Sequence, residues 1–182
     1  MLGSCVRVSS LIAIFALVLG CASVPGRESS ILITEREELI NITVPLSKLA
    51  IDVPKGRFQS VPIPSAIRSF IEPSFFQFQD EARGVRLAGW FEPAAKFQGV
   101  KDDAQVPHQN VEFKKVGKWD VVSYEWTTPR QITIAHHSAH LVQAGSWIVL
   151  HLSYLSAAPK RSFAEQHTLL DEVILSIQIS EK

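Results

Sequence analysis

Residues 147–155 read WIVLHLSYL, and residues 162–177 read SFAEQHTLLDEVILSI. In the first stretch every second residue from Ile148 to Tyr154 is large and apolar, which is the period of a β-strand with one buried face. The second stretch opens with Ser162 and Glu165 at capping-box spacing, where the two side chains satisfy free amides of the first helical turn. We therefore expect a central or near-central strand followed by a long amphipathic helix packed on the sheet. The side chains expected to face the sheet are Phe163, Leu170, Val173, Ile174 and Ile177.

The rest of the chain adds short strands before this pair and one short strand after the helix. Apolar runs bounded by proline, glycine or polar residues mark them. A turn is expected at 143–146, one or two helical turns at 62–74, and at 93–110 an exposed loop where a binding surface could sit. The expected strands are 39–44, 49–53, 75–78, 85–91, 111–115, 120–127, 131–142 and 177–180. Many antiparallel strands with one main C-terminal helix predict an α+β fold, an antiparallel sheet sandwich.

Three parts of this pattern look like the PsbP-like family. They are the early strand that ends in residues 51–54 (IDVP), the strand 147–154 that runs into a capped helix, and the closing residues 174–177 (ILSI). The pattern of strands and helix resembles that family over the whole mature domain, whereas specific sequence matches are confined to its C-terminal third. It implies a PsbP-like α+β sandwich with an accessory or assembly role. Members of that family share no demonstrated active site, so the resemblance implies no site residue here.

The N-terminal segment has the features of an export signal. Residues 8–19 (VSSLIAIFALVL) carry no charge and follow one basic residue, Arg7. The run is shorter than the about 20 apolar residues that a membrane-spanning helix needs, but it suits the apolar region of a signal peptide. We therefore expect residues 1–20 to be a signal peptide that is removed.

Residues 18–21 (VLGC) resemble the lipobox of bacterial lipoproteins. The resemblance implies that Cys21 receives a thioether-linked diacylglyceride and usually an N-acyl chain. Several acyl chains anchor a protein stably, because each buried methylene contributes about 0.8 kcal/mol. The other of the two cysteines, Cys5, lies in the segment to be removed, so Cys21 has no thiol to pair with. The alternatives are an ordinary secretory signal with a chance cysteine, or an uncleaved anchor.

Composition divides the mature chain into a tether and one domain. The small and polar residues of 21–36 predict a lipidated tether, and 37–182 has the length of a single α+β domain. Ala22, directly after the cysteine, resembles the sorting rule for outer-membrane lipoproteins. We therefore expect a lipid-anchored protein of the bacterial cell envelope on the periplasmic face of the outer membrane.

The histidines of residues 136–140 (HHSAH) are the one cluster that suggests chemistry. Strand-forming neighbours argue against a zinc-binding helix, and on a strand His136 and His140 share a face while His137 points away. A turn at Ala144-Gly145 would place His140 opposite Val149, with His151 diagonal to it. No Asp or Glu lies nearby in the sequence, so the expected metal is none and the histidines are expected to be structural. Metal binding by His136, His140 and His151 remains the alternative.

Other chemistries find little support. There is no Gly-x-Ser-x-Gly motif, no glycine-rich phosphate loop and no free thiol in the mature domain, so the sequence predicts no catalytic residue and no cofactor. Balanced charge, with 18 basic and 18 acidic residues, predicts no nucleic-acid partner. Adjacent carboxylates are expected to face solvent, and tryptophans, which could line a ligand pocket, are more often expected in the core or half-buried on a face of the sheet. They are Asp80, Glu81, Asp171, Glu172, Trp90, Trp119, Trp126 and Trp147.

Together these features predict a non-enzymatic accessory or binding module. Its acylated Cys21 would hold it to membrane lipid while the sandwich binds an unidentified envelope protein or a small ligand. The alternative function is that of a metal-binding protein or metal-dependent hydrolase, in which His136, His140 and His151 hold the metal.

Overall fold

A computed structural model describes residues 31–44, 47–56, 58–63, 74–100, 108–127, 131–155 and 160–182. The signal peptide, Cys5, Cys21 and the expected helical turns within 64–73 lie outside these described residues. Among the residues described, no helix combines the length and apolar character needed to cross a bilayer.

The described chain forms two antiparallel sheets and one α-helix, as the sequence predicts. The small sheet has the order β1-β2-β3-β11 and the large sheet the order β4-β5-β6-β10-β9-β8-β7. The small-sheet strands are β1 (Leu32–Glu35), β2 (Leu39–Thr43), β3 (Leu49–Pro54) and β11 (Gln178–Glu181). The large-sheet strands are β4 (Gln59–Ser60), β5 (Phe76–Asp80), β6 (Val85–Pro93), β7 (His108–Val116), β8 (Trp119–Thr127), β9 (Thr133–Gln143) and β10 (Ser146–Tyr154). A 3₁₀ turn, η1 (Ala94–Lys96), follows β6, and helix α2 (Phe163–Ser176) precedes β11.

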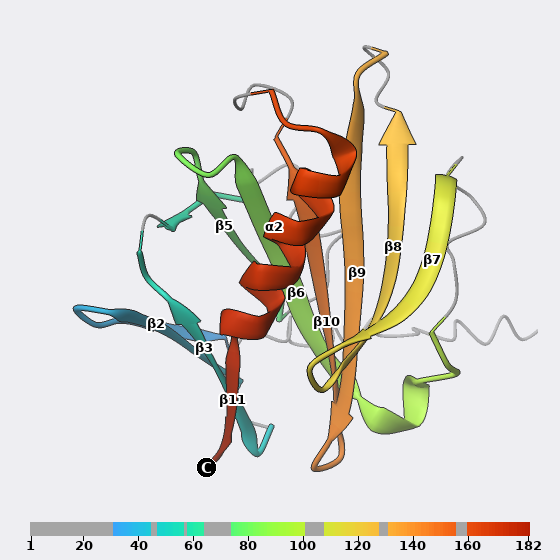
Figure 1. The fold of residues 1–182 in the computed structure, drawn as a ribbon. Coiled ribbons are helices and arrows are strands. Elements are labelled where there is room, and N and C mark those ends of the chain that lie inside the picture. The colour runs from blue at the N-terminus through green and yellow to red at the C-terminus, as the bar shows by residue number, and fades with distance from the viewer. Residues whose placement is uncertain are drawn as a thin grey trace, which may run out of the picture.

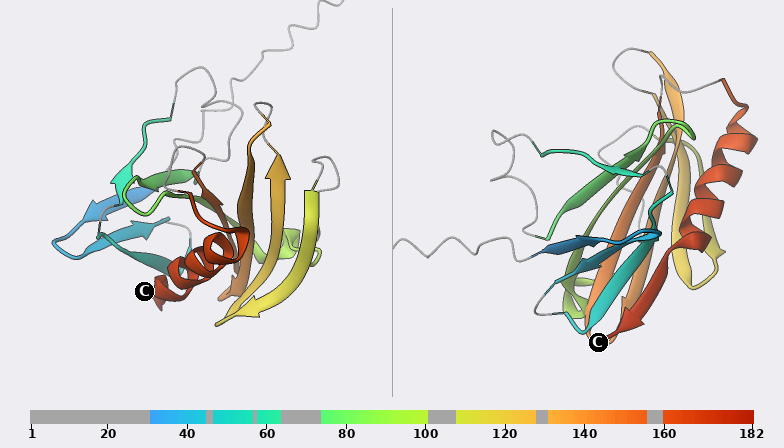
Figure 2. Two further views of the ribbon diagram at one scale, coloured as in Figure 1. Left: turned by 45° about the horizontal axis from the view of Figure 1, so that its top comes forward. Right: turned by 90° about the vertical axis from the view of Figure 1, so that its left-hand side faces the viewer.

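Helix α2 and the small sheet lie side by side against one face of the large sheet (Figures 1 and 2). We call this the inner face, and the opposite side of the large sheet the outer face. The core fills the space between the layers, and the side chains from β10 alternate as predicted, with Ile148, Leu150 and Leu152 completely buried. Burial of this alternating apolar set is what fixes the register of the sheet.

Close packing on the inner face depends on a glycine in β6. A Cβ at Gly89 would lie 2.6 Å from the Phe76 ring and 2.7 Å from the Val149 carbonyl oxygen. No side chain fits at those distances, so the glycine lets the Phe76 ring and β10 approach β6 directly.

Helix α2 begins where the sequence places it. The Ser162 side chain accepts a hydrogen bond from the Glu165 amide, and the Glu165 side chain accepts from the Ser162 amide, which confirms the capping box. Leu170, Val173 and Ile174 are buried as expected. Phe163 is 39% exposed, so its assignment to the buried face was wrong. It occupies the first helical position, before the helix has come close to the sheet.

The folded part starts before residue 37, because Leu32–Glu35, expected in the tether, pairs with β2 as strand β1. All four residues of β1 are exposed, so the apolar alternation that marks buried strands could not reveal it. Strand β7 likewise begins at His108, inside the expected loop. The turn at Ala144-Gly145 is confirmed, and both residues have positive φ.

Candidate functional site

Four aromatic and imidazole rings form a continuous row across the outer face. Trp90 of β6 stacks on His151 of β10, with ring centroids 5.1 Å apart. His151 meets His136 of β9 edge-on at 5.3 Å, and His136 stacks on Tyr124 of β8 at 4.7 Å. Neighbouring strands place these side chains at adjacent or diagonal positions of one face, where rings of this size come into contact. We call these four side chains the ring row.

A second group of rings lies on the same outer face, close to the turn between β9 and β10. His140 stacks on Trp147 with centroids 5.8 Å apart, and Phe97, just after η1, packs on both. His140 lies directly opposite Val149, as the expected turn required. The loop after β6 therefore contributes Phe97 to this face.

Hydrogen bonds link the three histidines of the outer face through a serine. Trp147 Nε1 donates to His140 Nδ1 at 3.2 Å, and His140 Nε2 lies 3.0 Å from Ser138 Oγ. Ser138 Oγ lies 3.4 Å from His151 Nε2, and His151 Nδ1 lies 3.2 Å from His136 Nε2.

The indole gives this hydrogen-bond chain a direction, because an indole nitrogen can only donate. His140 Nδ1 is then the acceptor, so His140 carries its proton on Nε2 and donates to Ser138 Oγ. If Ser138 in turn donates to His151, then His151 donates to His136. His140 takes part in this arrangement as a neutral ring, because its Nδ1 accepts from the indole. For His140, burial lowers the pKa below its ordinary value, against the opposing charge of Asp120.

The same hydrogen bonds oppose metal binding. Both nitrogens of His140 and both of His151 have protein partners, and a metal would have to displace them. Within the described residues no three His, Cys, Asp or Glu side chains are arranged to hold a metal ion. The structure places one carboxylate beside these histidines, although it is distant in sequence: Asp120 of β8 lies opposite His140 of β9 in the sheet register. Asp120 also forms an ion pair with Lys115 at 2.9 Å.

His137 points to the inner face, as expected, and there it belongs to a polar cluster under α2. Its Nε2 lies 2.9 Å from His167 Nδ1, and its Nδ1 lies 3.2 Å from Asp171 Oδ1. Ser123 Oγ lies 3.2 Å from His167 Nδ1, and Lys114 Nζ lies 2.7 Å from Asp171 Oδ2. We call these five side chains the inner cluster.

The inner cluster escaped the sequence analysis because its members come from four separate elements. One signal was available: His167 and Asp171 are four residues apart on α2 and so share a face.

The expectation that Asp171 faces solvent was wrong, because the carboxylate is turned to Lys114 and His137. It was also wrong for Asp80, which is 1% exposed and paired with Arg83, whose amide and guanidinium lower its pKa against the effect of burial.

The tryptophans divide between the two faces. Trp119 is 1% exposed and belongs to the core. Trp90 and Trp147 lie half-buried on the outer face with the histidines, so both environments expected for the tryptophans occur.

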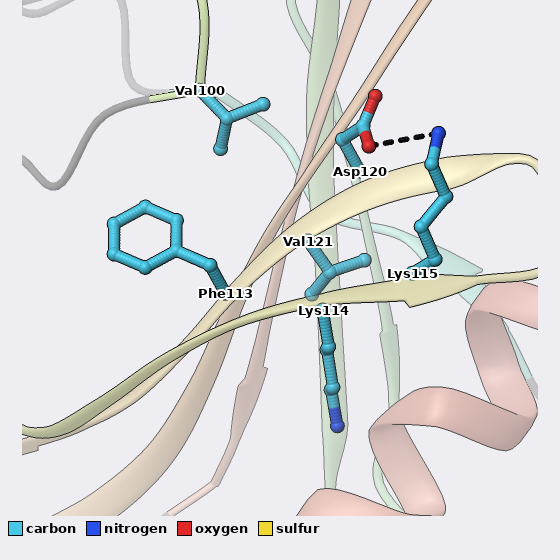
Figure 3. A pocket seen from close by; sticks show the side chains of 6 residues that line it. All are labelled: Val100, Phe113, Lys114, Lys115, Asp120 and Val121. Atoms are coloured by element: carbon cyan, nitrogen blue, oxygen red, sulfur yellow. Dashed lines mark ion pairs between the residues drawn. The ribbon is translucent and has the colours of Figure 1, made fainter.

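A shallow pocket lies near the β7 edge of the large sheet (Figure 3). It has a volume of about 300 Å³, and Val100 and Phe113 face each other across it while the Lys115–Asp120 ion pair lies to one side. Phe113 is 59% exposed. Val100 follows η1 in the same loop as Phe97, so this loop contributes to both the pocket and the ring-bearing part of the outer face.

No protein-family model matches the sequence, and no curated protein matches it either. Among solved structures, the chain is similar to cyanobacterial PsbP (CyanoP) from Synechocystis sp. PCC 6803, with 14% identity and a TM-score of 0.46, over 89% of this chain and 99% of that one. It is also similar to a protein from Bacteroides thetaiotaomicron VPI-5482, with 9% identity and a TM-score of 0.43 over 74% of this chain. The match spans 46% of that protein's length. Neither similarity bears on function.

Proposed function

We propose that this chain is a lipid-anchored envelope protein whose sandwich acts as a non-enzymatic accessory or binding module. The ring row carries the binding part of the proposal. Large flat side chains give binding surfaces much of their energy at a low entropic cost, because they have few rotatable bonds. Trp90, His136 and His151 are half-buried, and Tyr124 is 8% exposed. Stacking holds the four rings in place, and a hydrogen bond joins the two histidines, so the part of the ring row that reaches solvent is ordered before a partner arrives.

The anchor part of the proposal rests on residues 1–21. Acylation of Cys21 would hold the mature chain to the membrane, and Ala22 favours the periplasmic face of the outer membrane. Mass spectrometry of the purified protein and membrane fractionation test both points. We expect a diacylglyceride-modified cysteine at position 21, recovery with the outer membrane, and release of a Cys21→Ser variant. An unmodified thiol at position 21 would refute the anchor.

Cross-linking in intact envelopes, followed by solubilisation in detergent, tests the binding face with the full-length protein. We expect a specific cross-linked species with the wild type that disappears with Trp90→Ala, which removes one ring of the ring row. The matched control is Leu175→Ala, which truncates a 61% exposed apolar side chain on α2, away from the ring row. Equal yields from the wild type and both variants would show that binding does not use the outer face.

The second candidate function is metal binding by His136, His140 and His151, either alone or in a hydrolase. The observation in its favour is the 3.2 Å approach of His136 Nε2 and His151 Nδ1. A zinc titration of the full-length protein in detergent decides between the two. Stoichiometric binding that is lost in His140→Ala would favour the metal protein, and absence of binding would leave the binding module.

A further inference from the structure

The two halves of helix α2 are attached to the sheet in different ways. In the C-terminal half Leu170, Val173 and Ile174 are completely buried, and the chain continues into β11, which pairs with β3. In the N-terminal half residues 163–165 are exposed. The attachment there is polar: Gln166 Oε1 accepts from the Ala135 amide at 3.0 Å, and His167 reaches His137 and Ser123. Leu169 is the first fully covered apolar side chain of the helix.

His167 is the titratable member of this polar attachment that reaches solvent. It is half-buried, whereas the side chain of His137 is 0% exposed and lies beneath the helix. The charged or titratable groups around His167 come from α2 and from each strand packed against it. They are Lys114 and Glu112 of β7, Glu125 of β8, His137 of β9 and Asp171 of α2.

A proton on His167 is unfavourable while the helix is docked. It would place a second cation near the Lys114 ammonium, in a site partly shielded from water. Asp171, the nearest carboxylate on the helix, is already paired with that ammonium at 2.7 Å. Glu112 and Glu125 oppose this effect, but burial and Lys114 prevail, and the pKa of His167 lies below its ordinary value. Once the helix end lifts, water solvates the His167 imidazolium.

We propose that the N-terminal half of α2 is a proton-controlled latch, which lies on the sheet while His167 is neutral and lifts when His167 is protonated. The buried C-terminal half and the pairing of β11 with β3 keep the rest of the helix attached. Acidification therefore opens one end of the helix before it affects the central strands. This inference does not depend on the function proposed for the outer face.

Hydrogen exchange of the full-length protein in detergent, measured at pH 7, 6 and 5 and corrected for intrinsic rates, tests the latch. We expect protection of residues 163–169 to fall by up to tenfold per pH unit below about 6.5, because one proton is taken up on opening. Protection of β10 should stay unchanged over this range. Equal protection of residues 163–169 at pH 7 and pH 5 would overturn the proposal.

His167→Gln is the decisive variant, because its amide can still donate to His137 but cannot take up a proton. We expect it to flatten the pH dependence in residues 163–169, while His151→Gln on the outer face leaves that dependence as in the wild type. A pH dependence that persists in His167→Gln would overturn the latch.

If His167→Gln fails to fold, Lys114→Gln provides the second test. Removal of this neighbouring cation should also flatten the pH dependence of protection in residues 163–169. An unaltered or steeper pH dependence would contradict the proposal.

Discussion

The outer face and the inner cluster use histidines from the same strand in opposite ways. In β9, His136 and His140 point outward into stacked rings, and the indole of Trp147 donates to His140, whose pKa is lowered by burial. His137, between them in the sequence, points inward and lies under α2 beside Lys114 and Asp171. A strand turns successive side chains to opposite faces, so one short motif supplies two unrelated environments. The comparison shows that the motif HHSAH is not one site.

The largest expected difference between the two faces is in their response to acid. Burial, with the positive charges of Lys114 and His167 in addition, lowers the pKa of His137 to about 3. The unfolded chain, with an ordinary histidine pKa of about 6.5, binds more protons between these two values, so stability falls as pH falls through this window. The expected slope is about 1.4 kcal/mol per pH unit, which sums to about 5 kcal/mol between pH 6.5 and 3.

Urea unfolding at a series of pH values measures this slope. The matched variant is His137→Gln, in which the change of stability per pH unit should be shallower by about one proton, whatever its stability at pH 7. An identical slope in the wild type and the variant would show that the buried imidazole does not control acid stability.

A smaller effect is expected from Lys114→Met, which removes the cation of the inner cluster and keeps much of its apolar stem. The Asp171 carboxylate, 29% exposed, then loses its 2.7 Å partner. We expect a loss of about 2 kcal/mol in the free energy of unfolding at pH 7, the usual cost of a lost hydrogen bond to a charged group. The same variant should lose less stability in total between pH 6.5 and 3, because Lys114 lowers the pKa values of both His137 and His167 and its removal narrows the pH window of the loss.

Lys115→Met is the control for that variant. It removes the neighbouring lysine of β7, whose 69% exposed side chain pairs with Asp120 on the other face. An exposed pair of this kind contributes between zero and about 1 kcal/mol. Equal losses of stability in the two variants would mean that the inner cluster is no more than a surface ion pair.

The sequence predicted the outer face better than the inner cluster, for a physical reason. Strand period and turn chemistry act over a few residues, so they correctly placed His140 opposite Val149 and separated His137 from His140. They also predicted the capped helix and the central position of β10. The inner cluster depends on how α2 docks over β7, β8 and β9, and the local sequence indicates this long-range packing by little more than the spacing of His167 and Asp171 on one face of α2. The exposed strand β1 was missed because it carries no buried face.

The smallest expected effect is the most specific, and it concerns the direction of the hydrogen-bond chain on the outer face. Trp147→Phe keeps a ring beside His140 but removes the N–H that donates to Nδ1 at 3.2 Å. We expect a loss of about 1 kcal/mol, typical of one neutral hydrogen bond. In ¹⁵N spectra of the imidazole, the wild type should show His140 protonated on Nε2, and the variant should gain the Nδ1-protonated form.

Trp90→Phe is the matched control. The Trp90 indole donates to Glu92 at 3.1 Å and lies outside the hydrogen-bond chain, so His140 should keep its tautomer in this variant. A wild-type His140 protonated on Nδ1 would rule out the hydrogen bond from Trp147, and His140 Nε2 would then accept from Ser138 instead of donating to it.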